Sequence, residues 1–492
     1  MNDFVASIML MGAMASTDGY LPYWMTTNQY GLMPERRGGL ALLQVYSQSD
    51  RSRTIQYSCG VSLATNAYHN PLDPSSRTVN LMADELYGSV KWKLLTLDIG
   101  IKHRENDFIG ASRELGSLSV TGGHLVETGN ARSMPGYLLS LEPVALPWTR
   151  EHLWLYGAYG DYMTMDDRHV EGALVHRMRV GLRYAATDRL SFDAVIDHYA
   201  MWAGHHPTDV SYPVTIKNYI KVVTGRHAGE GGTMSDRLNV IGDHGGSEIF
   251  RVTYRADKWT LTAQHDIPYS DGSGMGFHNF PDGVNTLSFS FTDKNRWVSD
   301  ILYEHQYTLY QSGPINGEMF DDKGNSLTPP GVSTVGIDDY FGNSYYRSGW
   351  TYHGRVIGDP LFLPRGVHEQ TWTSARINRG IENNRVKSHH LGLGGKLFRK
   401  HPYKLMLTYT ENYGTYQAPY TGESQIQKPW GTVHETGLHQ ISAAFTGQLE
   451  SVFRISGLSV LYGLYLDKGQ LYQDAIGLTV GVRYTLGRGE VR

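Results

Sequence analysis

The chain has 492 residues, of which 40% are hydrophobic, and its formal net charge is -4. No run approaches the ~20 consecutive apolar residues that a membrane-spanning helix needs, so a helical membrane protein is excluded. Charges of both signs are scattered along the chain, which excludes a basic surface for nucleic acid. The mean hydropathy of -0.37 is compatible with a transmembrane β-barrel, in which only alternate residues are apolar.

Tyrosine and glycine are abundant, with 33 and 56 residues, whereas cysteine occurs once. Excess tyrosine is typical of the aromatic girdles of membrane barrels, and excess glycine fits turns and crowded lumen-facing positions. Cys59 has no partner for a disulfide. The N-terminal MNDFVASIML has neither the basic region nor the cleavage site of a signal peptide, so we expect a mature chain from which the signal has been removed.

Alternation of apolar and polar residues predicts about eighteen strands in chain order. They cover residues 4–14, 40–48, 54–63, 86–92, 95–101, 137–141, 153–159, 178–184, 190–196, 250–254, 259–263, 287–291, 297–307, 391–397, 403–409, 441–445, 458–466 and 474–486.

The clearest strand is the last, at 474–486. One face carries only apolar side chains, and the other carries small or polar ones. The apolar face consists of Ile476, Leu478, Val480, Val482, Tyr484 and Leu486. A strand of this length crosses a bilayer at a tilt of about 45°, whereas strands of soluble proteins are usually nearer five or six residues.

The connections between these strands alternate between short and long. If the first strand leaves one end of a barrel, the short turns between the predicted strands return to that end. The long connections fall at the other end and cover 16–38, 64–82, 103–136, 161–173, 201–247, 266–284, 311–387 and 412–437. Bacterial outer-membrane barrels are built in this way, with short periplasmic turns and long external loops. Soluble β domains, the alternative, have no reason to segregate their loops.

Two long insertions are large enough to fill a barrel lumen. The insertion at 201–247 contains Ile216, Tyr219 and Ile220 at helical spacing, which predicts an amphipathic helix within 214–223 that is a candidate plug. The second insertion covers 311–387. We therefore expect an all-β fold: a single transmembrane antiparallel up-and-down barrel domain over 1–492, whose lumen is obstructed by loops and short helices.

No motif indicates catalysis. There is no GxSxG sequence and no Ser/His/Asp spacing that identifies a nucleophile, so we expect neither an enzyme nor a cofactor. The neighbouring pairs His205-His206 and His389-His390 lack a second spaced pair of ligands, and we expect no metal site.

The predicted loops mix aromatic residues with short polar ones, notably at 20–31, 198–207 and 338–355. Tyr and Trp rings stack on sugar rings while polar groups bond the hydroxyls. Arg355 offers a guanidinium to an acidic sugar. The alternative is that these aromatics pack the loops together or anchor the membrane interface. The predicted glycan contacts are Tyr23, Trp24, Trp202, Tyr346, Trp350, Tyr352 and Arg355.

Several of these segments resemble the Wzi capsule-assembly family, in the form common among Bacteroidetes. The matching pieces are GYLPYWMTTNQYG, ELYGSVKWKLLTLDIGIKHRE, GNARSMPGY, MWAGHHP and YYRSGWTYHGRVIGDPL, and the match runs from about residue 4 to 486. The resemblance implies an eighteen-stranded outer-membrane barrel with an obstructed lumen that acts as a lectin for capsular polysaccharide. It offers no catalytic motif. Family helices lie near the periplasmic end, so the 214–223 helix either folds down the lumen or the loop alternation slips there.

These observations favour a protein of the bacterial outer membrane that attaches or assembles capsular polysaccharide by non-covalent glycan binding. Its expected partners are that polysaccharide, outer-membrane lipid and other outer-membrane proteins. One alternative is a porin or transport channel, against which the lumen-filling insertions argue. The other is an accessory scaffold of a larger outer-membrane complex.

Overall fold

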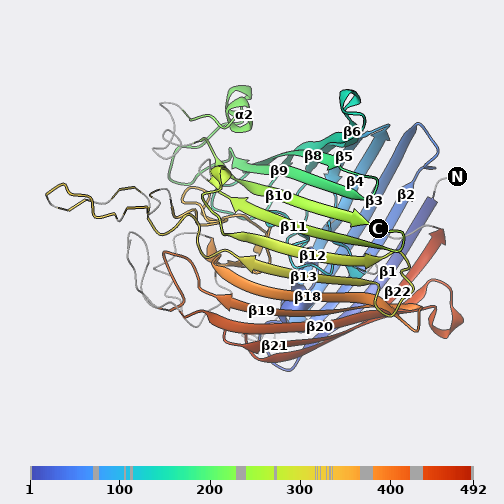
Figure 1. Cartoon of the computed structure of the whole chain (residues 1–492). Coiled ribbons are helices and arrows are strands. Elements are labelled where there is room, and N and C mark those ends of the chain that lie inside the picture. The colour runs from blue at the N-terminus through green and yellow to red at the C-terminus, as the bar shows by residue number, and fades with distance from the viewer. Residues whose placement is uncertain are drawn as a thin grey trace.

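The computed structural model describes residues 3–488 apart from 70–76, 105–106, 111–114, 229–239, 271–273, 316, 319, 322, 329, 332–333, 335, 366–379 and 422–435. Within these residues, eighteen antiparallel strands form one closed sheet (Figure 1). The first strand pairs with both the second and the last, so that Ser7 lies opposite Gln44 on one side and Thr485 on the other. The predicted transmembrane up-and-down barrel is confirmed.

The barrel strands come in two runs, separated by one long connection after β13. The first run is β1 (Asp3–Ala15), β2 (Gly38–Gln48), β3 (Ile55–His69), β4 (Arg77–Trp92), β5 (Leu95–Ile101), β6 (Gly136–Ala145), β7 (Leu153–Met163), β8 (Leu174–Ala185), β9 (Leu190–Trp202), β10 (Asp243–Arg255), β11 (Trp259–Tyr269), β12 (Gly283–Phe291) and β13 (Asp300–Tyr307). The second run is β18 (Val386–Leu397), β19 (His401–Asn412), β20 (Leu438–Glu450), β21 (Leu458–Gly469) and β22 (Ala475–Arg488).

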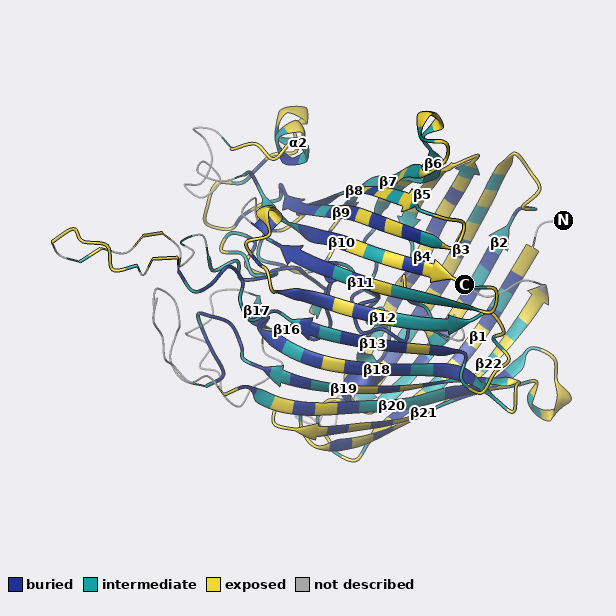
Figure 2. Cartoon of the chain, in the orientation of Figure 1, coloured by how far each residue is buried: buried dark blue, intermediate teal, exposed yellow. Residues whose placement is uncertain are grey.

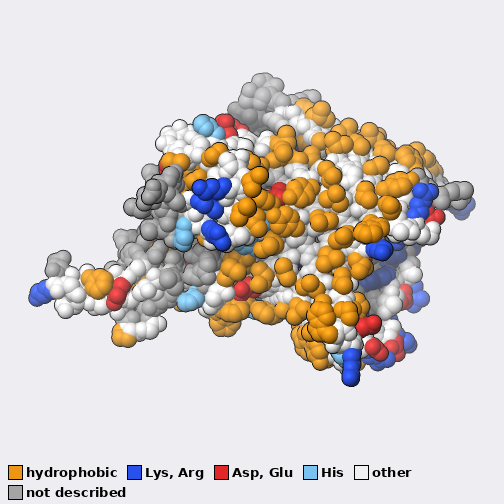
Figure 3. All heavy atoms as spheres, turned by 90° about the horizontal axis from the view of Figure 1, so that it is seen from above, with side chains coloured by type: hydrophobic (Ala, Val, Ile, Leu, Met, Phe, Trp, Pro, Cys, Tyr) orange, Lys and Arg blue, Asp and Glu red, His pale blue; other side chains and the backbone are white. Residues whose placement is uncertain are grey.

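The outer wall is apolar, as the alternation predicts. On β22, the side chains of the predicted hydrocarbon face are 37–56% exposed although all of them are hydrophobic. Similar rows on the neighbouring strands merge into a broad hydrophobic band on the face of the barrel that is seen from above (Figures 2 and 3). Such a surface is stable in a bilayer and unfavourable in water, so the strands span a membrane.

The connections are sorted between the two ends of the barrel (Figure 1). Short turns such as 49–54 and 93–94 lie at one end, called here the short-turn end. The long connections, including 16–37 and the described parts of 308–385, lie at the opposite, long-loop end. This arrangement was predicted correctly, although the link at 470–474 is short and lies at the long-loop end.

One predicted loop was wrong. Most of 64–82 is strand, because β3 continues to His69 and β4 begins at Arg77. Asn66 and Asn80 face the lumen there and bond each other, with 2.9 Å between Asn80 Nδ2 and Asn66 Oδ1. Their polarity made the segment look like a loop, but polar residues are normal on the inner face of a barrel.

Short elements complete the described structure. They are α1 (Tyr23–Thr26), η2 (Pro147–Thr149), α2 (Ile216–Val223), η3 (Gly274–Gly276), β14 (Thr351–Tyr352), β15 (Arg355–Val356), β16 (Leu363–Pro364), β17 (Ile381–Asn383) and η4 (Val452–Arg454). No helix in the described part of the chain is both long and apolar enough to cross a bilayer.

Helix α2 forms where the spacing predicts it, but it does not plug the barrel. It packs on the outside of the wall, where the Tyr219 and Trp202 rings lie 5.5 Å apart (Figure 1). Trp202 belongs to the outward face of β9, together with the exposed Ile196. The helix covers this face because its own buried side, at Val222, packs on the apolar side chains of Ala200 and Trp202.

Candidate functional site

Connections from the long-loop end obstruct the lumen. Residues 115–135, called here the plug segment, enter between the walls, and Leu118, Val120 and Leu125 are 1–2% exposed. Buried parts of 336–365 pack beside them, for example through Thr128 N, which bonds Ile357 O at 2.9 Å. Helix α1 also lies inside, with Met25 1% exposed. The expectation of a lumen obstructed by loops is confirmed.

The plug segment is bonded to the wall through its backbone. Glu304 on β13 accepts Val120 N at 2.8 Å and the Thr121 hydroxyl at 2.7 Å. Asp266 on β11 accepts Leu125 N at 2.8 Å. Carboxylates that point inward from a barrel wall can therefore satisfy the amide groups of an irregular buried segment, which would otherwise be left unpaired.

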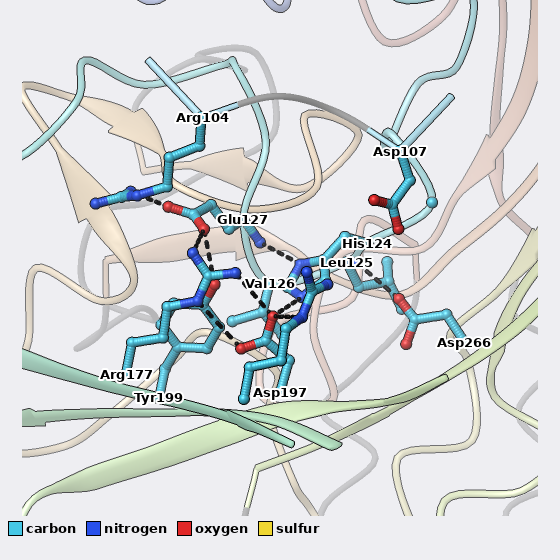
Figure 4. Close-up of polar contacts among 12 residues, drawn as sticks. Arg104, Asp107, His124, Leu125, Val126, Glu127, Arg177, Asp197, Tyr199 and Asp266 are labelled. Carbon is cyan, nitrogen blue, oxygen red and sulfur yellow. Dashed lines mark hydrogen bonds and ion pairs between the residues drawn. The ribbon is translucent and has the colours of Figure 1, made fainter. Parts of the chain in front are cut away.

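A buried ion network joins the same segment to β8 and β9 (Figure 4). Arg177 lies between two carboxylates, with Nη1 2.7 Å from Glu127 Oε2 and Nη2 2.9 Å from Asp197 Oδ2. His124 and Arg179 also contact Asp197, each at 2.9 Å, and Asp197 is fully buried. Each buried charge has partners, which is the condition for burying charge at all.

A β-bulge forms a second polar cluster. The register between β3 and β4 shifts after Ser62, so that the consecutive residues Asp84 and Glu85 both face inward. Asp84 Oδ1 contacts His103 Nε2 at 2.6 Å, and its other oxygen accepts the Ser62 hydroxyl at 2.7 Å. Glu85 accepts His103 N at 2.8 Å and Tyr46 OH at 2.7 Å. The trio has the spacing of a metal site, but all four carboxylate oxygens already have protein partners.

A large cavity lies between the plug segment and the wall of β3–β8. Its volume is ≈ 730 Å³, and its lining mixes polar and charged groups of both signs. Ion pairs join several of these charges, such as Lys102 Nζ and Asp98 Oδ1 at 2.7 Å. Its charged lining includes Lys91, Asp98, Lys102, Arg104, Asp107, Glu127, Glu142, Arg177 and Arg179.

Six of the seven predicted contact residues are buried, with 2–7% exposure: Tyr23, Trp24, Trp202, Tyr346, Trp350 and Tyr352. Trp24 Nε1 donates to Thr408 Oγ1 at 3.1 Å, and Trp350 Nε1 donates to Val126 O at 2.7 Å. In this arrangement, most of these rings hold loops to one another or to the wall. Contact between them and a glycan stays a prediction.

Two of the seven, Tyr352 and Arg355, line a small polar cavity together with Arg132. Its volume is ≈ 60 Å³, which holds a few water molecules or one polar substituent and not a whole sugar ring. Asn66 and Asn80, near the long-loop ends of β3 and β4, form part of its wall.

The cavity brings two arginines together. Gly31 separates them: a Cβ at this position would lie 3.4 Å from Arg355 Cδ and 3.5 Å from Arg132 Cγ, and its φ is +63°. Burial lowers the pKa of the Arg355 guanidinium, nearby Glu35 raises that pKa, and Arg132 lowers it further. Two guanidinium groups beside one exposed glutamate leave the cavity with an excess of positive charge, which suits an anionic group.

Sequence reasoning did not identify Arg132, Asn66 or Asn80 as site residues. Arg132 stands in the GNARSMPGY piece, but nothing local indicates that it faces Arg355, which is distant in sequence. Only the folding of the long connections onto the inner wall brings them together.

Comparison with solved structures supports the fold. Wzi, an outer-membrane protein involved in group 1 capsule assembly in Escherichia coli and described as a carbohydrate-binding β-barrel, is similar with a TM-score of 0.52 and 13% identity, over 97% of this chain and 83% of that one. OccK3 (OpdO) of Pseudomonas aeruginosa has a TM-score of 0.47 and 11% identity over 99% and 96%. OccAB2 of Acinetobacter baumannii has 0.45 and 10% over 99% and 98%.

No protein-family model matches the sequence. No curated protein matches it either. At these identities, the structural likeness extends to the barrel fold alone.

Proposed function

We propose that this protein is a lectin-like barrel of the bacterial outer membrane that binds acidic capsular polysaccharide at the cell surface. The observation that carries the proposal is the arginine-paired, tyrosine-lined cavity at the long-loop end of a barrel whose lumen is obstructed by the plug segment. An obstructed lumen suits retention of a ligand better than its passage. The similarity in fold to Wzi, a carbohydrate-binding barrel involved in capsule assembly, and the sequence resemblance to the same family support this function.

The chemistry is non-covalent recognition. A carboxylate on the polysaccharide enters between Arg132 and Arg355 and relieves the repulsion between their guanidinium groups. The Tyr352 hydroxyl and the amides of Asn66 and Asn80 supply donors and acceptors for neighbouring hydroxyls. The rest of the sugar lies outside the small cavity, against Glu35 and His353, which are exposed.

Glycan binding by the purified barrel in detergent tests the proposal. Surface polysaccharide from the host should bind saturably, and Arg132→Gln and Arg355→Gln should each weaken binding by roughly 10-fold or more, since charge-assisted hydrogen bonds contribute about 1.5–3 kcal/mol. Arg347→Gln is the matched control, because this arginine is exposed and lies in the same long connection. Reduction of the polysaccharide carboxyl groups to alcohols should weaken binding to the wild type.

Two outcomes would show whether the proposed site or the proposed lectin function is wrong. Binding that is unchanged in both arginine variants keeps a lectin but removes this cavity as its site. A further variant, Trp350→Ala with Tyr352→Ala, asks whether the predicted aromatic contacts take part. No binding of any host polysaccharide would overturn the lectin.

A channel is the second candidate, and the cavity of ≈ 730 Å³ favours it. Its charged lining resembles part of an ion pathway that the plug segment interrupts. Single-channel recording decides between the two functions. We expect no sustained large conductance from the wild type, and observing one would favour the channel.

A further inference from the structure

Helix α2 lies against the membrane-facing side of the barrel wall. Its inner side packs Val222, which is fully buried, and Tyr219 against the outward faces of β7 and β9. In Figure 2, the side of the helix that faces the barrel is buried and the opposite side is exposed. The helix therefore occupies space that lipid takes along the other strands.

A polar cluster, in which His176 is fully buried and Asp161 partly buried, fixes the helix there. Tyr219 OH lies 2.6 Å from Tyr159 OH and 2.8 Å from Asp161 Oδ2, and Asp161 Oδ1 contacts His176 Nδ1 at 2.9 Å. Tyr159, Asp161 and His176 belong to the outward faces of β7 and β8. Without a cover, a carboxylate and an imidazole would face hydrocarbon, which is strongly unfavourable. The helix covers them, and His176 is fully buried as a result.

Helix α2 and the residues just before it expose several aliphatic side chains. Ile216 is 81% exposed, Val214 65%, Ile220 50% and Val210 44%. This patch continues the hydrophobic band, because Ile196 on the adjacent β9 is 43% exposed. In water it would be unfavourable, whereas at a membrane surface it is the face that inserts.

Basic residues lie beside the aliphatic ones. At ~100° per residue, Ile216 and Ile220 occupy one flank of the exposed side, and Lys217 and the half-exposed Lys221 occupy the other. Lys221 Nζ also donates to Ala228 O. Exposed Arg226 lies three residues after the end of the helix. Seen from above, basic side chains gather near α2 at the long-loop edge of the hydrophobic band (Figure 3). An apolar flank beside a basic one is the pattern of a helix that lies in the plane of a membrane interface.

We propose that α2 is an interfacial lipid anchor at the long-loop end. Its aliphatic flank inserts among acyl chains, and Lys217, Lys221 and Arg226 bind the phosphates of lipid head groups. The proposal depends on the membrane-spanning barrel and is independent of the glycan site.

Depth-dependent quenching tests the insertion. In a Cys59→Ser background, an environment-sensitive label is placed at Ile220→Cys or, as the control, at exposed Lys323→Cys in the long connection after β13. After reconstitution in vesicles, lipids with brominated acyl chains should quench the label at position 220 several-fold more than the label at 323. Equal quenching would overturn the proposal. Protection of position 220 from aqueous iodide without quenching by bromolipid would also overturn it, because a protein would then cover the helix.

Lipid adducts test the phosphate contact. Lipid A is added to the intact barrel in detergent, and adducts are counted by native mass spectrometry. The variant Lys217→Gln, Lys221→Gln, Arg226→Gln should hold several-fold fewer adducts than the wild type. The control Lys323→Gln, Arg347→Gln should match the wild type, and each variant's heat-dependent gel migration verifies its fold. Excess inorganic phosphate should not displace the lipid. Equal adducts in the triple variant, or full displacement by free phosphate, would overturn lipid head groups as the ligand.

Discussion

The plug segment and helix α2 both belong to connections at the long-loop end, but they pack on opposite sides of the barrel wall. Each follows a strand that runs towards the long-loop end, β5 for the plug segment and β9 for α2. The plug segment is rich in small and polar residues and meets the inward carboxylates Glu304, Asp266 and Asp197. The helix presents Val222 and Tyr219 to an outer face that is apolar apart from one polar cluster.

The difference shows that the wall selects where a connection goes. Inside, an irregular backbone needs acceptors for its amides, and the lumen supplies carboxylates. Outside, backbone groups must be satisfied within the segment itself, which a helix achieves. Length alone therefore does not show that an insertion after a barrel strand is a plug. Its composition must be compared with the face that it will cover.

The largest expected effect comes from removing the shared carboxylate of the inner network. Asp197→Ala leaves the buried Arg177 and the half-buried Arg179 without their main counter-charge, which should lower the free energy of unfolding by about 3–5 kcal/mol. Denaturant unfolding in detergent measures this change. Asp167→Ala removes an exposed carboxylate nearby and should have little effect. Equal stability of the two variants would show that the network does not hold the plug segment.

A pH dependence should come next. Burial raises the pKa of Asp359, which is fully buried in the connection beside the plug segment, to about 7. Because the folded protein binds this proton more tightly than the unfolded chain does, stability should fall as the pH rises from roughly 4 to about 7, by up to ~4 kcal/mol, and then level off.

Thermal unfolding between pH 5 and pH 8 measures this dependence. Asp359→Asn should make the profile less steep, since an amide does not titrate in this range. Part of the slope should remain, because burial also raises the pKa of Asp282 to about 7. Asp188→Asn, which changes an exposed carboxylate, should leave the profile as in the wild type. Identical profiles for wild type and Asp359→Asn would assign the pH dependence to other groups.

A smaller change is expected for Glu304→Gln. The amide still accepts one hydrogen bond, but the charge that holds Val120 N and the Thr121 hydroxyl is lost, at about 1.5–3 kcal/mol. Hydrogen exchange at Val120 and Thr121 should accelerate, while Glu318→Gln, an exposed control, changes neither amide. Unaltered exchange at both amides would mean that the plug segment is held elsewhere.

The smallest effect concerns the helix. Tyr219→Phe removes the hydroxyl that bonds Tyr159 and Asp161, but Asp161 keeps its contact with His176. We expect a loss of about 1 kcal/mol and faster hydrogen exchange in α2 without faster exchange in the plug segment. Tyr20→Phe, at an exposed position, is the matched control. Acceleration in both segments would show that the two sides of the wall are coupled.

The barrel could be predicted because every second residue of a membrane-spanning strand faces lipid and is apolar. Ile476 and Val480, assigned to hydrocarbon from their alternation, are indeed exposed on the outer wall. The prediction failed where a second layer covers the wall. From residue 199 to 202, both faces of β9 are buried, one under α2 and the other against the plug. The alternation disappears there, and the predicted strand stops at 196, six residues before the observed end.

The candidate site was less predictable, for a related reason. From the sequence alone, an aromatic residue that stacks on a sugar cannot be distinguished from one that packs a loop. Trp350 therefore fits either interpretation. The structure packs its ring against that of Tyr199, with 5.6 Å between the ring centroids. Arg132 carries no local signal, because its charge matters only beside Arg355. Contacts between separate long connections do not appear in any single stretch of sequence.

The bulge at Asp84 has a consequence for insertions and deletions. The bulge adds one residue to β4, and the side chains of two consecutive residues, Asp84 and Glu85, therefore both face the lumen. Because of this extra inward residue, the apolar side chains on both sides of the bulge still face lipid. Deleting Asp84 would restore simple alternation, with Ala83 outside, Glu85 inside and Leu86 outside as before. Deleting a residue such as Gly88 would instead turn the apolar row of one half of the strand into the lumen. Within β4, a natural or engineered single-residue deletion should therefore be tolerated at the bulge and rejected elsewhere.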